Sequence, residues 1–265
     1  MSTLSVPFYV VDAFTSRPFS GNPAGVALLN EWPSDSWLQS VAAEVALSET
    51  AFLVGRELRW FTPTVEVGLC GHATLATAHV LKHHTQAKDN PIVFDTRAGQ
   101  LTVAAHGSHY LLDFPARTAK PDDSCRAAIE AALKTRVNDI LASHDRYICF
   151  LDSAEQIAAL APDFSAIAAL PLAGLVVTAP GKDSIDFVSR YFAPAKGVPE
   201  DPVTGTSHCV LAPLWATRLS KTRLHARQLS PRGGDVLCTL LDSERVLLSG
   251  QACTFSSGAM VAPLA

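Results

Sequence analysis

Short apolar runs separated by turn residues open the chain. Residues 8–14 are rich in β-branched and aromatic side chains, which is typical of a strand. A turn rich in Gly, Asn and Pro follows, and residues 26–29 then resume the apolar run. Apolar residues at helical spacing, preceded by capping residues, predict a helix over residues 33–45. The chain therefore mixes strands and helices from its start.

The stretch over residues 61–80 combines a turn with the entrance of an apolar helix. A Pro-containing turn leads into Cys-Gly-His-Ala-Thr at residues 70–74, and the helical pattern begins there without a break. Gly71 has no Cβ, so a ligand can approach the backbone closely. The first turn offers unpaired N–H groups and the positive end of the helix dipole. An anion such as a carboxylate would bind there.

The second half of the chain repeats this pattern. A strand-like run ends in Phe-x-Pro at residues 61–63 and again at 192–194. Gly71 corresponds to Gly205 at an offset of 134 residues (205 minus 71), and the same offset relates the later glycines 99 and 233. Matching landmarks at nearly one offset predict two similar halves, each a sheet wrapped around one central helix.

A polar segment with prolines separates the two halves. It runs from about residue 115 to residue 123. We therefore predict two domains, residues 1–115 and residues 116–265. If the halves are alike, their helix N-termini are expected to face one another across a cleft that holds a small anionic substrate.

Four side chains close to these helix entrances can carry protons. They are Glu49, His72, Asp201 and His208. Such a set suits removal of a proton next to a carboxylate or carbonyl group and its return elsewhere. Considered alone, Glu49 would be a surface residue at a strand start, and Glu44 and Glu66 compete with it as the catalytic carboxylate. The sequence has no phosphate-binding loop, dinucleotide-binding glycine motif or nucleophile elbow.

Composition excludes several classes of partner. The net charge of −4 and the absence of basic runs argue against nucleic acid. No apolar run is long enough to span a membrane, and the first residues lack the features of a signal peptide. Six scattered cysteines without a Cys-x-x-Cys pair predict free thiols in a cytoplasmic protein. No metal site is expected, because His79, His83 and His84 lack a suitably spaced carboxylate or cysteine.

An ordered set of motifs resembles the phenazine biosynthesis PhzF-like isomerase family, from about residue 8 to the C-terminus. The matching segments are 12–14, 21–25, 48–50, 61–63, 70–74, 200–205, Gln228 and 232–234. The resemblance implies the α+β fold of diaminopimelate epimerase, in which each half is a mostly antiparallel, barrel-like sheet around a central helix. It also implies a homodimer that works without a cofactor.

The characterised PhzF enzyme moves a proton within a dihydro-hydroxyanthranilate. By the resemblance, Glu49 is the acid/base residue that shuttles the proton, and His72 and Asp201 position the substrate and assist the transfer. The chain is therefore expected to be a cofactor-independent isomerase of a small carboxylate-bearing metabolite. This implication displaces the interpretation of Glu49 as a surface residue.

Both helix entrances and one loop residue are assigned to substrate binding. The carboxylate is expected at the helix entrances, and Asn22 competes as a ligand contact with a purely structural Asn-Pro turn. Thr206 departs from the Ser or Ala expected in the family but keeps a hydroxyl. The assigned residues are Asn22, Gly71, Ala73, Gly205, Thr206 and Ser207.

Two alternative functions remain. Racemases of this fold use one cysteine at each helix entrance, and here Cys70 has Thr204 as its counterpart. A hydroxyl is far less acidic than a thiol, so a two-thiol racemase or epimerase is disfavoured. A non-catalytic ligand- or protein-binding member of the family would not need the acid/base set of Glu49, His72 and Asp201.

Overall fold

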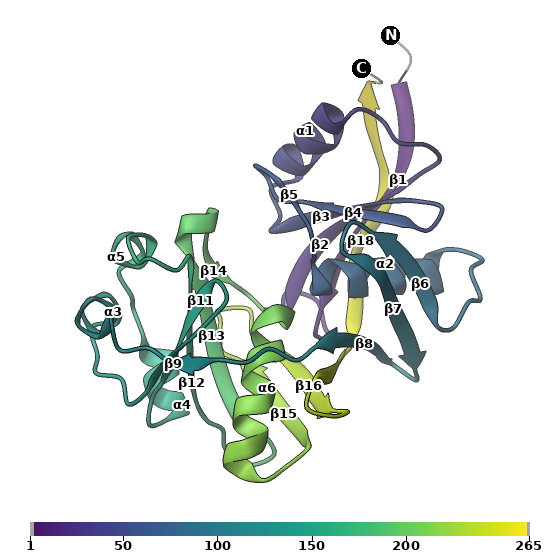
Figure 1. The fold of residues 1–265 in the computed structure, drawn as a ribbon. Helices are drawn as coiled ribbons and strands as arrows, with labels where there is room; N and C mark the ends of the chain where they lie inside the picture. The colour runs from purple at the N-terminus through teal and green to yellow at the C-terminus, as the bar shows by residue number, and fades with distance from the viewer. Residues whose placement is uncertain (1–2, 264–265) are drawn as a thin grey trace. The chain divides into compact units, whose positions relative to one another are not determined.

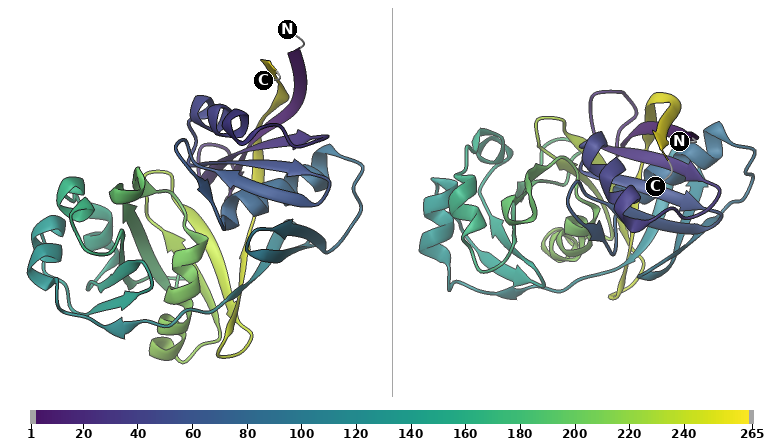
Figure 2. Two further views of the ribbon diagram at one scale, coloured as in Figure 1. Left: turned by 45° about the horizontal axis from the view of Figure 1, so that its top comes forward. Right: turned by 90° about the horizontal axis from the view of Figure 1, so that it is seen from above.

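The computed structural model describes residues 3–263, which divide into two compact units (Figure 1). The first unit contains the residues up to Asp113 and those from Ser249 onward, and the second is Phe114–Leu248. The last strand, β18 (Ala252–Pro263), joins the first unit because it runs antiparallel to β1 (Thr3–Ala13) along its length (Figures 1 and 2). The sequence-based division instead assigned every residue after 115 to the second half.

The first unit is built on a mixed sheet. β2 is antiparallel to β1 and parallel to β3, β4 follows antiparallel to β3, and β6 lies parallel to β4 on its other side. The short β5 pairs with β4 and leads the chain toward the central helix. These strands are β2 (Asn22–Leu29), β3 (Glu49–Val54), β4 (Glu57–Phe61), β5 (Glu66–Val67), β6 (Ile92–Thr96), β7 (Gly99–His106) and β8 (His109–Pro115).

Two helices cover this sheet. The face that carries Phe52 packs against α1 (Asp35–Val45), whose N-cap Ser34 accepts a hydrogen bond from the backbone N–H of Trp37. α2 (Gly71–His84) contacts β1, β2, β3 and β18. Every residue of α2 from Gly71 to Val80 is buried. α2 is therefore the central helix that the sequence predicts for the first half.

The second unit repeats the order of pairing. β11 is parallel to β12, β13 is antiparallel to β12, and β15 is parallel to β13. The short β14 pairs with β13, as β5 does with β4. These strands are β9 (Lys120–Pro121), β10 (Ile140–Ser143), β11 (Arg146–Phe150), β12 (Gly174–Pro180), β13 (Phe187–Ala193), β14 (Val198–Asp201), β15 (Arg223–Gln228), β16 (Gly234–Leu240) and β17 (Arg245–Gly250).

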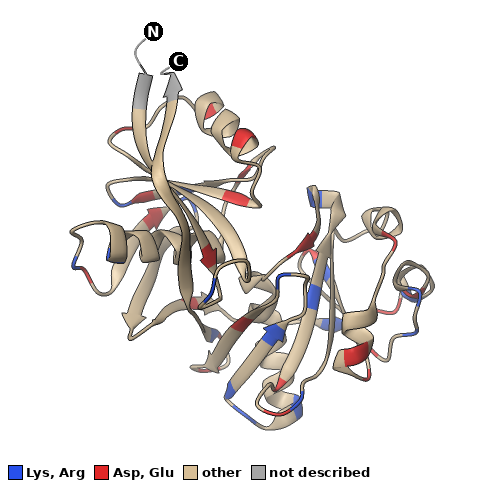
Figure 3. Ribbon diagram, turned by 180° about the vertical axis from the view of Figure 1, so that it is seen from behind, with Lys and Arg blue, Asp and Glu red and all other residues tan. Residues whose placement is uncertain are grey.

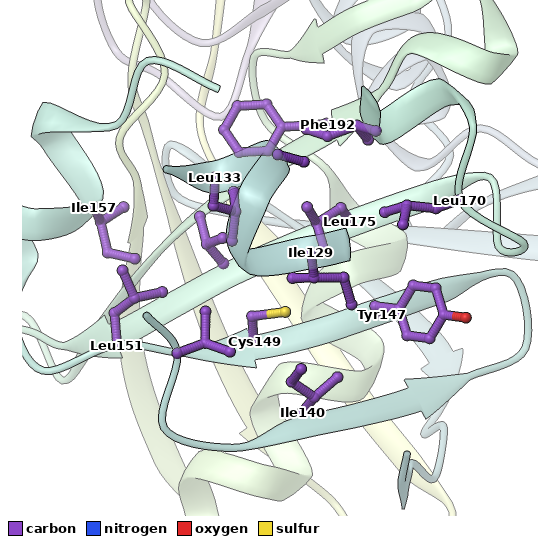
Figure 4. Packing of buried hydrophobic residues seen from close by; sticks show 14 of the residues in the cluster. Ile129, Leu133, Ile140, Tyr147, Cys149, Leu151, Ile157, Leu170, Leu175 and Phe192 are labelled. Carbon is purple, nitrogen blue, oxygen red and sulfur yellow. The ribbon is translucent and has the colours of Figure 1, made fainter. Parts of the chain in front are cut away.

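Helices lie on both faces of the second sheet. α3 (Arg126–Leu133), α4 (Ala154–Ala159) and α5 (Phe164–Ala168) contribute isoleucine and leucine side chains to one large apolar cluster (Figure 4). α6 (Gly205–Leu219) lies on the opposite face, where the indole N–H of Trp215 donates to Thr178 Oγ1 at 2.9 Å. Successive side chains of β12 point to opposite faces, which places Thr178 away from the cluster.

The two central helices begin at the glycines that the sequence pairs. α2 starts at Gly71 and α6 at Gly205. Each follows a short strand that pairs with the strand ending near the Phe-x-Pro motif. The predicted α+β class, with two similar halves around central helices, is confirmed within each unit.

A partly buried ion pair holds each of the hairpins that lead to these helices. Arg59 donates to both carboxylate oxygens of Glu66 at 2.8 Å, and Arg190 donates to both oxygens of Glu200 at 2.7 and 2.9 Å. Figure 3 shows acidic and basic residues on neighbouring strands of the second unit. Bidentate pairing fixes geometry as well as charge. The pairs therefore lock strand β4 to β5 and β13 to β14.

The cysteines are free thiols, as the sequence predicts. Burial raises the pKa of the Cys149 and Cys209 thiols to about 12, so neither is reactive near neutral pH. None of the helices described between residues 3 and 263 is long and apolar enough to cross a membrane.

Removing the guanidinium of Arg190 should destabilise the protein strongly. The group is nearly buried with Glu200 and also donates to two backbone carbonyls of the α4 region. Arg190→Ala should lower the free energy of unfolding by about 3 kcal/mol, because Glu200 would stay buried without its partner. Lys182→Ala breaks an exposed ion pair and serves as control, with little expected loss of stability because solvent screens the pair. Urea denaturation measures both, and equal losses would contradict the prediction.

Candidate functional site

Glu49 and His72 come together at the start of a strand and of a helix. Glu49 is the first residue of β3, and His72 is the second residue of α2. Their side chains meet with His72 Nε2 3.4 Å from Glu49 Oε2. The Glu49 side chain keeps 19% exposure, whereas that of His72 keeps 6%. A carboxylate that is partly exposed thus lies against a buried imidazole, and the structure brings together two of the side chains that the sequence assigns to proton transfer.

Burial keeps His72 neutral. Removal from water lowers the pKa of His72 to about 3, because the charged imidazolium loses its hydration. Its Nδ1 lies 3.3 Å from Asn22 Nδ2 and 3.4 Å from Cys70 Sγ. Both ring nitrogens are therefore engaged within the first unit.

Asn22 is fixed from both ends of its amide. The residue is fully buried at the start of β2, and its Oδ1 accepts a hydrogen bond from Ser48 Oγ at 3.0 Å. The turn before it requires glycine: Gly21 has a φ of +66°, and a Cβ there would lie 2.1 Å from the carbonyl oxygen of Ala13. The turn thus fixes where β2 begins. The predicted contact between Asn22 and substrate is not tested by these protein contacts.

The first turn of α2 has no side-chain cap on its backbone N–H groups, and its residues Gly71, His72 and Ala73 are buried. Its N-cap Cys70 has an extended backbone and makes no side-chain capping bond, so its side chain does not cover the first N–H groups. Cys70 instead offers its carbonyl oxygen to the N–H and hydroxyl of Thr74, at 3.1 and 2.6 Å. The backbone at Gly71 and Ala73 belongs to this turn, where the sequence predicts carboxylate binding.

In the second unit, Asp201 is held by the residues that precede α6. Asp201 ends β14, and its Oδ2 accepts a short hydrogen bond from the hydroxyl of Thr204, the N-cap of α6. Gln228 accepts from the Thr204 N–H at 2.9 Å and donates to the Asp201 carbonyl oxygen at 2.6 Å. Gln228 is fully buried. The buried amide therefore orients the loop that presents the Asp201 carboxylate.

Arg146 adds a cation to the first turn of α6. Its Nη1 donates to Ser207 Oγ at 2.8 Å and to Thr206 Oγ1 at 3.3 Å. Its Nε donates to Asp145 at 2.8 Å, and the guanidinium lies over the ring of Tyr191 at 4.8 Å. The sequence predicts roles for Thr206 and Ser207 but not for Arg146. The one available signal was a basic residue opening a strand, which alone is unspecific.

Asp145 offsets the charge of Arg146. Burial alone would raise the pKa of Asp145, but its hydrogen bonds and charge interactions with Arg146 and Lys196 hold that pKa well below the ordinary value. Asp145 therefore stays ionised through the neutral range. The turn at α6 combines hydroxyls, backbone N–H groups and a guanidinium that already has one carboxylate partner.

The remaining candidate side chains have structural surroundings. His208 is fully buried, donates from Nδ1 to the Thr204 carbonyl at 2.8 Å and packs near the Phe187 ring. Burial is the main reason that its pKa falls to about 4. Glu44 lies exposed on α1, and Glu66 is bound by Arg59. Of the three carboxylates that compete in the sequence, only Glu49 contacts His72.

Three side chains of this site have the spacing of metal ligands. Glu49, Cys70 and His72 each offer one ligand atom, and these atoms lie within 4.8 Å of one another. An imidazole nitrogen, a thiolate and a carboxylate are a donor set that Zn²⁺ accepts. The same arrangement can also serve proton transfer by Glu49 without a metal.

Comparisons with known proteins identify relatives over nearly the whole chain. The family model described as phenazine biosynthesis-like protein, PhzC-PhzF, matches residues 11–258. An uncharacterised isomerase of Pseudomonas aeruginosa is 48% identical over 259 residues, which cover 96% of this chain and 98% of the relative. The human phenazine biosynthesis-like domain-containing protein is 34% identical over 293 residues, covering 98% of this chain and all of the relative.

A solved structure shows how closely the fold is shared. The crystal structure of an Enterococcus faecalis protein of the PhzF family has a TM-score of 0.92 at 42% identity, covering 97% of this chain and 99% of that one. A hydroxyproline epimerase from Agrobacterium vitis has a TM-score of 0.66 at 13% identity, covering 98% and 92%. That second likeness shows the fold alone, and it confirms the diaminopimelate epimerase-like class.

His72 should not titrate near neutral pH. The pKa of His72 is about 3 in the folded chain, against an ordinary value of 6.5 that applies to the unfolded chain. As pH falls from 7 to 5, the unfolded chain therefore binds a proton at this residue and the folded chain does not. This residue alone should therefore remove about 2 kcal/mol of folding free energy between pH 7 and pH 5. NMR of ¹⁵N-histidine-labelled protein should show unchanged His72 ring signals over the same interval. A midpoint above pH 5 would contradict the assignment.

Proposed function

The chain belongs to the PhzC-PhzF family of phenazine biosynthesis-like proteins, and we propose that it moves a proton within a small carboxylate-bearing metabolite, with Glu49 as the proton carrier. Similar proteins of this family are named isomerases, and the chain is an enzyme of the isomerase or epimerase class. The observation that supports proton transfer most directly is the contact of Glu49 with a buried, neutral His72.

Glu49 and His72 have different roles in the proposed reaction. The Glu49 carboxylate removes a proton from a carbon next to a carbonyl or carboxylate and returns it to another carbon of the same substrate. His72, whose Nε2 lies 3.4 Å from Glu49 Oε2, is proposed to position the carboxylate. Burial disfavours an imidazolium there, so the proton resides on Glu49 during the transfer.

The substrate carboxylate is proposed to bind backbone N–H groups at the helix entrances. Gly71 and Ala73 would supply them at α2, and Gly205, Thr206 and Ser207 at α6. Fixed dipoles of this kind stabilise negative charge that develops when a carbon loses its proton. That one substrate meets both helices stays a prediction of the sequence.

Asp201 is proposed as an assisting residue. Its carboxylate is oriented by Thr204 and by the Gln228 bridge, which is what a group that positions substrate requires. The Thr204 hydroxyl is occupied by Asp201, which supports the inference that Thr204 does not replace the second thiol of a racemase. We further propose a cytoplasmic homodimer that acts without a cofactor, following the family resemblance and the free cysteines.

Replacing the Glu49 carboxylate by an amide should abolish turnover. Glu49→Gln keeps the shape of the side chain but cannot take up a proton, so isomerisation should fall by about 1,000-fold. The assay follows a dihydro-hydroxyanthranilate and other small unsaturated acids in deuterated water by NMR. Glu44→Gln, the same change at an exposed position of α1, should keep wild-type activity.

Three outcomes of this assay are informative. Activity that persists in Glu49→Gln would overturn the role of Glu49. Tight binding of an acid without hydrogen exchange or isomerisation would instead favour the non-catalytic binding protein. Loss of activity after dialysis against EDTA, with recovery on adding Zn²⁺, would contradict the proposed metal-free reaction at Glu49, Cys70 and His72.

The thiol of Cys70 should be dispensable for chemistry. In a two-thiol racemase, Cys70 would be one of the two bases, and Cys70→Ala would lower kcat by about 1,000-fold or more. We expect a loss within about tenfold, because in the proposed reaction Cys70 only packs against His72 at 3.4 Å. Steady-state kinetics on the wild-type substrate measures the difference, and a loss as large as that of Glu49→Gln would favour the thiol mechanism.

A further inference from the structure

We propose that Asn22 is a positioning residue that holds His72 in one tautomer, with the ring proton on Nε2 facing Glu49. The catalytic consequence rests on the proposed function of Glu49 as proton carrier. The tautomer itself follows from contacts within the first unit. Asn22 lies 50 positions before His72 in the sequence and reaches it only because β2 begins beside the first turn of α2.

The contacts of Nδ1 determine where the ring proton sits. Asn22 Nδ2 lies 3.3 Å from His72 Nδ1, and an amide nitrogen donates hydrogen bonds but does not accept them. Nδ1 must then carry the lone pair. In a neutral imidazole the other nitrogen carries the proton, and burial keeps this imidazole neutral. The proton of His72 is therefore on Nε2.

Ser48 and His72 contact opposite ends of the Asn22 amide. Ser48 Oγ donates to Asn22 Oδ1 at 3.0 Å, and the NH₂ group is directed at His72. Asn22 is fully buried, so water does not compete for either end of the amide. The hydroxyl, the amide and the imidazole thus form a directed chain of donors.

The surroundings of Nε2 favour the same tautomer. Glu49 Oε2 lies 3.4 Å away, and a carboxylate oxygen is better placed beside an N–H group than beside a lone pair. Ser48 Oγ lies 3.5 Å from Nε2 and offers a second acceptor. If the Asn22 amide were rotated, its oxygen would accept a hydrogen bond from a protonated Nδ1. The lone pair of Nε2 would then lie against the Glu49 carboxylate. Asn22 prevents this repulsive arrangement.

The second unit places a different donor at the related position. Arg146, the first residue of β11, donates to Thr206, the second residue of α6, just as Asn22, the first residue of β2, donates to His72, the second residue of α2. The strand start therefore holds the helix entrance in both units. In the unit that contains Glu49 the donor is neutral, so it sets the tautomer without adding a charge beside the carboxylate.

Asn22→Asp tests the proposal, because a carboxylate at this place accepts where the amide donates. Long-range ¹H–¹⁵N NMR of the full-length, histidine-labelled protein distinguishes a protonated ring nitrogen from one with a lone pair. The wild type should show the lone pair on Nδ1. Asn22→Asp should move a proton onto Nδ1 and lower kcat by about 100-fold or more, with a smaller change in KM. Asn30→Asp, exposed just beyond the end of β2, should change neither.

Two further variants keep the test decisive. Ser48→Ala removes the donor that orients the amide, so the His72 signals should spread over both tautomers. Cys70→Ala removes the other neighbour of Nδ1 and should leave the tautomer unchanged. A wild-type His72 protonated on Nδ1, or an unchanged tautomer in Asn22→Asp, would overturn the proposal.

The NMR result also separates this proposal from the proposed function. If Glu49→Gln keeps full activity while His72 shows its lone pair on Nδ1, the role of Glu49 fails and the tautomer assignment stands. If Glu49→Gln is inactive and Nδ1 carries the proton in the wild type, the role of Asn22 fails alone.

Discussion

The burial of α2 constrains everything around its first turn. From Gly71 to Val80 the helix is enclosed, so each polar side chain that it carries there must find a partner inside the unit. His72 meets this requirement with Asn22 at Nδ1 and Ser48 at Nε2, and Glu49 lies 3.4 Å from Nε2. Because the imidazole is too deeply buried to become charged, Glu49 is left as the group that can exchange protons.

The two units share a fold but carry different side chains at the entrances of their central helices. Both begin a central helix after a short strand locked by a bidentate Arg–Glu pair. At the helix entrance the first unit has a thiol, and the second has the hydroxyl of Thr204, which binds Asp201. Duplicated geometry with unlike side chains places Glu49 beside the central helix of the first unit and an oriented carboxylate, Asp201, beside that of the second.

Local patterns in the sequence predict the scaffold well. Glycines at helix entrances and the repeated Phe-x-Pro motif identify Gly71 and Gly205, because these landmarks recur in both halves at nearly one offset. The position of the last strand, β18, is not predicted by such patterns. Its pairing with β1 joins the two ends of the chain, and no local pattern carries that information.

The site is predictable only in part for a similar reason. The choice of Glu49 came from a family resemblance. The structure adds a physical reason to prefer it over Glu66, because Glu66 is bound by Arg59. Gln228 belongs to the matched motifs, yet its bridge between Thr204 and Asp201 depends on side-chain directions. Arg146 carried no specific signal, since a basic residue at a strand start is common on protein surfaces.

The central claim is that one carboxylate carries the proton from one carbon to another of the same molecule. A substrate that carries deuterium at the carbon losing its proton tests this claim in ordinary water, with product analysed by mass spectrometry and NMR at low conversion. A single carrier covered by the bound substrate should deliver part of the deuterium to the new position in the product. Complete replacement of the label by solvent hydrogen from the first turnover would contradict the account and indicate two separate acid and base groups.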